Sequence, residues 1–285
     1  MKFLSPFAVC LAATLTLPAG SEETLDEIRA RLNVRPEAWE GFGAGSYVDV
    51  KTTTTVGDKT VVIEERVTLA KRDKDGTRLE RCRIERSKGA DGNEVIELGT
   101  PSVMVFPVKS PWEFKDLKEV RKEDLVVGGK TISCRVIRAT YTFDMGSPVP
   151  GQKGSVITFP AIIWWSPIAE GSNGIVRIES EQPKGQLPQI SVNTRMIDTA
   201  REARVGNSPL LCGVYSAKGL WQGEKEMHDV ESWVCAAVPG RAVRIVERGK
   251  NDASPDSLLK TVTTEVMAFE AKKEAGAGQA EPKGK

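Results

Sequence analysis

The chain has 285 residues, with 40 Lys and Arg against 39 Asp and Glu. A chain of this length can bury one large hydrophobic core or two smaller ones. Its balanced charge gives no basic surface for nucleic acid or for an acidic membrane, so we expect neither as a partner.

The first 20 residues have the pattern of a secretory signal peptide. Lys2 supplies a positive charge, residues 7–17 are apolar, and small residues follow Pro18. The apolar run is shorter than the roughly 20 residues that span a bilayer. An uncleaved anchor is the alternative. We predict that residues 1–20 are removed, which leaves a periplasmic or secreted protein without a transmembrane segment.

A short amphipathic helix is predicted within residues 22–33. Leu25, Ile28 and Leu32 have the spacing of one helical face, and Pro36 follows to stop the helix. Acidic residues at its start and arginines near its end suit the helix dipole.

Residues 47–98 are predicted to form a four-stranded antiparallel meander. Segments rich in Val, Thr and Ile alternate there with Gly-Asp or Asp-Gly turns. Residues 101–122 contain prolines and then many charges, and we predict a connector. We group the helix, the meander and the connector as one unit, residues 21–122.

Two segments share the pattern V-G-x-x-x-[I/L]-x-C-x-V, residues 127–136 and 205–214. Each is followed by a Trp-containing strand and another strand, with Trp165 matching Trp233 and Arg177 matching Arg244. This order predicts a duplicated β-unit. Chance recurrence of a short Val/Gly pattern is the alternative. The predicted copies occupy residues 123–188 and 189–270.

The C-terminal end is predicted to contain one more strand and a tail. Residues 258–269 are rich in Val and Thr, which favours a strand over a helix. Residues 271–285 have no large apolar side chain, so we predict disorder. The predicted fold is therefore α+β and predominantly antiparallel β: a curved sheet or meander with a short N-terminal helix and a duplicated β-unit.

The most apolar stretch beyond the signal lies within residues 159–168. Successive strand residues point to opposite faces, so the adjacent Trp164 and Trp165 must lie on different faces. One interpretation is a strand buried on both faces, covered by the N-terminal helix or by the other copy. The other is an apolar sheet face that binds a lipid or similar hydrophobic ligand. The candidate ligand-binding residues are Phe159, Ile162, Ile163, Trp164 and Trp165.

Four cysteines remain after the signal: Cys82, Cys134, Cys212 and Cys235. An even number in an oxidising compartment suggests disulfides, and four cysteines allow three pairings. Free buried thiols are the alternative, because Cys is often a core residue. The sequence does not choose between these.

Residues that would carry catalysis are sparse. His228 is the single histidine, which excludes a histidine-rich metal site, and no G-x-S-x-G motif is present. The glycines of residues 41–45 follow a helix and open a strand, the reverse of a nucleotide-binding loop. We expect no catalytic site, no metal and no cofactor.

The order of elements resembles that of the lipoprotein-localisation-factor-like proteins of the bacterial envelope. The similarity covers about the first hundred residues: a signal peptide, the helix with Leu25, Ile28 and Leu32, and a meander entered through Gly45 and Ser46. The resemblance implies a curved antiparallel sheet wrapped around helices, with acyl chains carried on the concave side. It transfers no site residue.

We therefore predict a non-enzymatic envelope protein that binds a lipid or other hydrophobic ligand. Its partners would be a lipid, a lipidated protein or another envelope protein. The alternative is a structural or protein-interaction module without a small-molecule ligand. A hydrolase that uses carboxylates from distant strands is a third hypothesis.

Overall fold

The computed structural model describes ten segments of the chain: residues 23–33, 38–73, 76–88, 93–106, 112–144, 156–169, 172–180, 192–220, 227–250 and 259–273. The predicted signal peptide and most of the predicted tail lie outside these segments. The elements are α1 (Leu25–Asn33), β1 (Tyr47–Val56), β2 (Lys59–Asp73), β3 (Gly76–Lys88), β4 (Glu94–Leu98), β5 (Ser102–Phe106), β6 (Trp112–Val127), β7 (Lys130–Asp144), β8 (Val156–Trp165), β9 (Ile175–Ser180), β10 (Val192–Val205), β11 (Ser208–Leu220), β12 (Met227–Val234), β13 (Ala242–Lys250) and β14 (Leu259–Glu270).

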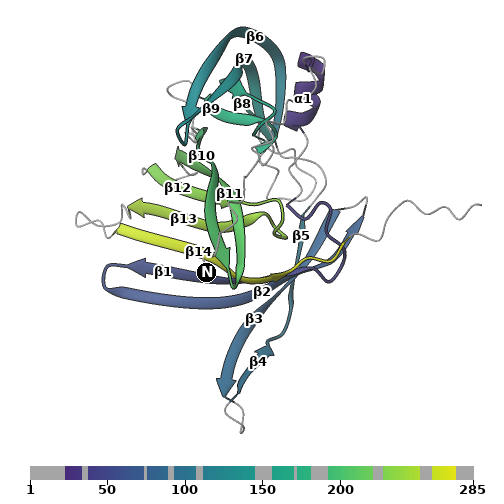
Figure 1. The fold of residues 1–285 in the computed structure, drawn as a ribbon, viewed down its shortest axis with the longest axis vertical. Coiled ribbons are helices and arrows are strands. Elements are labelled where there is room, and N and C mark those ends of the chain that lie inside the picture. Colours follow the sequence, from purple (N-terminus) through teal and green to yellow (C-terminus); the bar gives the residue numbers. More distant parts are fainter. Residues whose placement is uncertain are drawn as a thin grey trace, which may run out of the picture.

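One antiparallel sheet contains all the strands of the described segments (Figure 1). Its order is β4-β3-β2-β1-β14-β13-β12-β11-β10-β9-β8-β7-β6, and β5 pairs with β3. The sheet holds an N-terminal meander (β1–β4), a first meander (β6–β9) and a second meander (β10–β13). Strand β14 pairs with both β13 and β1 and so joins the second meander to the N-terminal one. The predominantly antiparallel α+β fold and the four strands of residues 47–98 are confirmed.

Tight turns set the register of the hairpins. Val127 pairs with Lys130 across Gly128 and Gly129, and both glycines have positive φ, 55° and 77°. A two-residue turn with positive φ at both positions matches the twist of the flanking strands. The sequence therefore fixes the β6–β7 register through this turn.

Strand β8 is buried on both faces. Ile163 and Trp165 pack with Ile28 and Leu32 of α1 in one cluster of buried residues. Trp164 lies in a different cluster, with buried residues of β10 and β11. The alternation of a strand places the two indoles on opposite faces, as predicted. The helix covers one face and the second meander covers the other.

Helix α1 is held to the first meander at its C-terminal end by its apolar stripe and by a polar bridge. The Asn33 side chain donates to the Phe114 carbonyl at 3.0 Å and accepts from the Phe114 amide at 2.6 Å. Because Phe114 lies on β6, α1 belongs with the first meander. This corrects the grouping of the helix with the N-terminal meander in residues 21–122. The apolar stripe requires an apolar partner, and β6–β9 provide it.

Two predicted irregular segments are structured. The predicted connector 101–122 contains β5 and the first part of β6, so the boundary at residue 122 falls inside a strand. The charged residues of β6 led to its assignment as a connector, because an edge strand tolerates charges that a central strand does not. The predicted tail begins later than residue 271, since the Lys272 amide donates to Ser46 Oγ at 2.9 Å and Lys273 pairs with Phe42.

The first and second meanders have matching register. Val136 pairs with Trp164, and Val214 pairs with Trp233. On the next strand Trp164 pairs with Arg177, and Trp233 pairs with Arg244. A register shift follows each of these tryptophans. Trp164, rather than Trp165, therefore occupies the position of Trp233. The duplication itself stays a prediction.

Gly174 is predicted to be essential for the close approach of Trp165. Gly174 has φ +89°, and a Cβ atom there would overlap the indole Nε1, which donates to the Asn173 carbonyl at 3.1 Å. Left-handed strain costs roughly 1–2 kcal/mol, and overpacking adds about 1–3 kcal/mol. We expect urea unfolding to show that Gly174→Ala lowers the free energy of unfolding by the sum of these two amounts. Gly129→Ala is the control, because Gly129 also has positive φ but meets open space. Equal losses in the two variants would contradict this packing.

Candidate functional site

The five residues predicted to bind a hydrophobic ligand alternate between the two faces of β8. Phe159, Ile163 and Trp165 are buried and share one parity along β8. Ile163 and Trp165 belong to the cluster that contains the buried residues of α1. Trp164 is buried toward the second meander, where Ile162 is partly buried. Packing accounts for all of them as core residues. A ligand here would have to displace α1 or the second meander, and ligand binding by these residues stays a prediction.

An aromatic row extends this core. The Tyr141 ring lies 4.9 Å from the Phe114 ring and 4.8 Å from the Phe159 ring, between centroids. Burial raises the pKa of the Tyr141 hydroxyl to about 12. A phenol in such surroundings stays protonated at physiological pH and is unsuited to act as a base.

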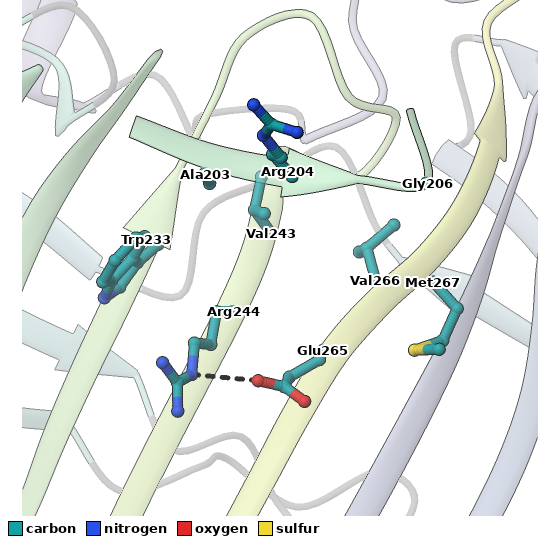
Figure 2. A pocket seen from close by; sticks show the side chains of 9 residues that line it. All are labelled: Ala203, Arg204, Gly206, Trp233, Val243, Arg244, Glu265, Val266 and Met267. Carbon is teal, nitrogen blue, oxygen red and sulfur yellow. Dashed lines mark ion pairs between the residues drawn. The ribbon is translucent and has the colours of Figure 1, made fainter. Parts of the chain in front are cut away.

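A different part of the sheet has an open hollow, the Trp233 pocket. It has a volume of about 300 Å³ and lies where the end of β10 crosses β13 and β14 (Figure 2). Trp233 lines it from β12. The other apolar lining side chains are Ala203, Val243, Val266 and Met267, and the charged ones are Arg204, Arg244 and Glu265.

Cross-strand pairing positions the polar residues of the pocket. Trp233 pairs with Arg244, and Arg244 pairs with Glu265, so the three side chains form a row across β12, β13 and β14. Arg244 Nε lies 3.1 Å from Glu265 Oε1. This is an ion pair without hydrogen-bond geometry, because the buried Nε atom has no hydrogen-bond partner within the described segments. The row thus holds a guanidinium that is ion-paired with one carboxylate and lies beside an indole.

A second guanidinium lies over the same indole. Arg201 Cζ is 5.3 Å from the Trp233 ring and Arg244 Cζ is 5.9 Å from it, both within cation–π range. Trp233 Nε1 donates to Glu231 Oε1 at 2.7 Å, which fixes the ring. Arg201 pairs with Asp198 at 3.3 Å. A backbone hydrogen bond from Ala200, followed by the Arg201 side chain, lowers the pKa of Asp198, so this carboxylate is ionised at neutral pH.

The corresponding position in the first meander is closed. Trp164 is 5% exposed, and Arg177 Cζ lies 4.5 Å from its ring. Glu123 pairs with Cys134 in the same register in which Arg201 pairs with Cys212. One meander therefore has an acid where the other has an arginine. Trp233 is only partly buried and lies beneath two guanidinium groups, each of which is paired with an acid.

Arg204 adds a further positive charge at the pocket. It is exposed, and within the part of the chain that the structure describes it forms no ion pair. Apolar walls, an indole and several guanidinium donors suit a ligand that has an apolar body and an acidic group.

A second hollow, of about 340 Å³, lies over β9, β10 and β11. Its lining includes Arg177, Arg195 and Lys218, with Ile178 as its one large apolar side chain. Arg177 is paired with Glu179, and Lys218 Nζ lies 3.5 Å from Asp229 Oδ1. Without apolar walls it offers less to a small ligand than the Trp233 pocket does.

The sequence contained part of the signal for the Trp233 pocket. Trp233 and Arg244 belong to the predicted duplicated unit, but nothing in the pattern distinguished them from core residues. Glu265 has no local signal at all, because its place in the row depends on β13–β14 pairing.

Among the described residues, no group of three or more His, Cys, Asp or Glu side chains is arranged to hold a metal ion.

None of the helices in the described segments has the length and apolar character needed to cross a membrane. No protein-family model matches the chain, and no curated protein matches it.

Two solved structures are similar over most of the chain. One comes from the MucA/MucB complex of Pseudomonas aeruginosa, with 12% identity and a TM-score of 0.18, and covers 86% of this chain and 99% of its own. The other is a structure of MucB in complex with MucA(peri), with 11% identity, a TM-score of 0.17 and the same coverage. The resemblance to lipoprotein-localisation-factor-like proteins stays a prediction.

Proposed function

We propose that this protein is a non-enzymatic binding protein of the cell envelope, whose ligand has one apolar ring or short chain and one acidic group. The Trp233 pocket is the observation that carries this proposal. Its apolar walls match the body of such a ligand, and the Arg244 guanidinium lies beside Trp233 in the lining. A guanidinium forms charge-assisted hydrogen bonds with a carboxylate, so an acidic group on the ligand gains affinity there.

The size of the pocket limits the ligand. A volume of about 300 Å³ is at the lower end for small-molecule sites. A lipid with two long chains does not fit within it, whereas a single ring or a short chain does. The predicted hydrophobic ligand is therefore narrowed to a small amphipathic anion.

The titratable groups support binding without catalysis. Hydrogen bonds lower the pKa of Glu123 and Asp198, and burial raises the pKa of the Cys134 and Cys212 thiols to about 11. These shifts keep the acids ionised and the thiols protonated at neutral pH. A general acid or a thiolate nucleophile requires the opposite shift.

The location rests on residues 1–20, which have the pattern of a signal peptide. N-terminal sequencing of the protein purified from its own host is expected to begin near residue 21. An intact Met1 on protein from the envelope fraction would indicate an uncleaved anchor instead.

The pocket can be tested with 2-naphthoate, which combines an apolar ring system with a carboxylate. Isothermal titration calorimetry is expected to show binding of 2-naphthoate and much weaker binding of the uncharged 2-naphthamide. Arg244→Gln should weaken naphthoate binding by about tenfold, since a hydrogen bond to a charged group contributes roughly 1.5–3 kcal/mol. Glu265→Gln should strengthen it about threefold, because a surface ion pair that competes for Arg244 is worth about 0–1 kcal/mol.

Arg177→Gln is the matched control for these variants. Arg177 also lies over a tryptophan, but that residue is Trp164, and Arg177 lines the other hollow. Naphthoate affinity should be unchanged in this variant. Equal affinity for naphthoate and naphthamide, or a loss confined to Arg177→Gln, would contradict binding at the Trp233 pocket.

A second candidate function, protein interaction, is favoured by the apolar edge formed by β4 and β5. Both strands pair with the same edge of β3, one after the other, and neither has another strand partner among the described residues. Six of their large apolar side chains are exposed: Val95, Ile96, Leu98, Val103, Val105 and Phe106. Exposed apolar edges recruit additional strands. We therefore propose an extended segment of another protein as the occupant.

Photo-crosslinking in host cells tests this edge. A photo-reactive residue in place of Val105 is expected to give an adduct with one defined protein, and Val103→Lys should abolish the adduct. A probe in place of Val126 is the control, because Val126 on β6 is 76% exposed but lies at the opposite end of the strand order. Adducts from both positions, or an adduct with a second copy of this chain, would contradict the proposal.

A further inference from the structure

The four described cysteines are not equivalent in their surroundings. Cys134, Cys212 and Cys235 are buried, and Cys82 is partly buried. Cys82 pairs with Arg66 across β2 and β3. The surroundings of the other three depend on the matching register of the two meanders.

Cys212 and Cys235 are neighbours across β11 and the end of β12. Gly213 pairs with Val234, so the next position along each strand brings Cys212 opposite Cys235. Both belong to the same cluster of buried residues, and after burial the proximity of Cys235 further raises the pKa of the Cys212 thiol. Directly opposed residues in antiparallel strands have Cα atoms about 4.5–5.5 Å apart. That separation lies within the roughly 4.4–6.8 Å that a disulfide spans.

The first meander provides an internal comparison. Arg135 pairs with Trp165, so Cys134 lies opposite Ser166. Ser166 and Cys235 also make the same kind of turn contact: the Ser166 amide donates to the Gly174 carbonyl, and the Cys235 amide donates to the Arg241 carbonyl, each at 2.8 Å. The second meander therefore has a thiol where the first has a hydroxyl. Cys134 has no thiol opposite it.

We infer that Cys212 and Cys235 form a disulfide when the chain meets a thiol–disulfide oxidant, while Cys82 and Cys134 stay reduced. One thiolate attacks a sulfur of the oxidant's disulfide, which forms a mixed disulfide and releases an oxidant thiolate. The second thiolate then attacks the mixed disulfide, so the Cys212–Cys235 bond forms and the other oxidant thiolate leaves. Two electrons pass to the oxidant, and the two protons lost by the cysteines are available to its thiolates.

Burial determines when this reaction takes place. It raises the pKa of the Cys212 thiol to about 11, so the folded protein holds almost no Cys212 thiolate at neutral pH. Oxidation therefore proceeds during folding or local opening, and the finished disulfide is shielded from reductants. Cys235 lies two residues beyond Trp233, so the bond also ties the strand that carries Trp233 to β11.

Peptide mapping tests the pairing directly. The protein is unfolded, reduced, and refolded in a mixture of oxidised and reduced glutathione, then alkylated and digested with trypsin under non-reducing conditions. We expect residues 205–218 to be linked to residues 226–241, with Cys82 and Cys134 alkylated. Alkylation of both Cys212 and Cys235, or linkage of either one to Cys82 or Cys134, would overturn the inference.

Thermal unfolding gives a second measurement. Closing a loop between Cys212 and Cys235 is expected to raise the Tm of oxidised protein by about 5–10 °C over reduced protein. Cys235→Ala should remove this difference. Cys134→Ala should keep it, because Cys134 is equally buried but lies opposite Ser166. If Cys235→Ala does not fold, the peptide map of the natural sequence still decides the pairing. An equal difference in both variants would also overturn the inference.

Discussion

Burial of β8 on both faces is the constraint on which the rest of the structure depends. Its side chains of one parity, Ile163 and Trp165, require the cover that α1 supplies. Those of the other parity, including Trp164, require the second meander. Because a strand cannot direct two adjacent indoles to one side, a single covering element would leave a large apolar surface in water. The first meander therefore needs partners from both the N-terminal helix and the downstream part of the chain.

The two meanders share a register but differ at a few positions, and these differences give them different chemistry. Trp164 is enclosed, with Glu123 at the position opposite Cys134. Trp233 is partly open, with Arg201 at the position opposite Cys212. Arg177 over the enclosed indole is paired with Glu179, and Arg201 and Arg244 over the open indole are paired with Asp198 and Glu265. The charge that favours an anion at the open indole is therefore the exposed Arg204. The same sheet geometry thus supports a core in one meander and an open pocket in the other.

The two ends of the sheet are protected to different degrees. Strand β6 has a charged sequence and two register shifts against β7, features that discourage pairing with another chain. Strands β4 and β5 are short but expose valine, isoleucine, leucine and phenylalanine side chains. Short length by itself does little to prevent a strand from pairing with another protein when its side chains are apolar. The β4–β5 end is therefore the more suitable place for contact with another protein.

The sequence by itself determined the antiparallel β class, the short helix with Ile28 and Leu32 inside, and the opposite directions of Trp164 and Trp165. These follow from local periodicity and turn residues, which act within a few positions along the chain. It did not reveal β6, because edge strands accept charge, and it placed α1 with the wrong meander. Only the tertiary structure decided what covers each face of β8, which thiol lies opposite Cys212, and that Trp233, Arg244 and Glu265 form one row. Those relations depend on strand pairing between distant segments. The spacing of side chains along one strand does not identify the strand that pairs with it.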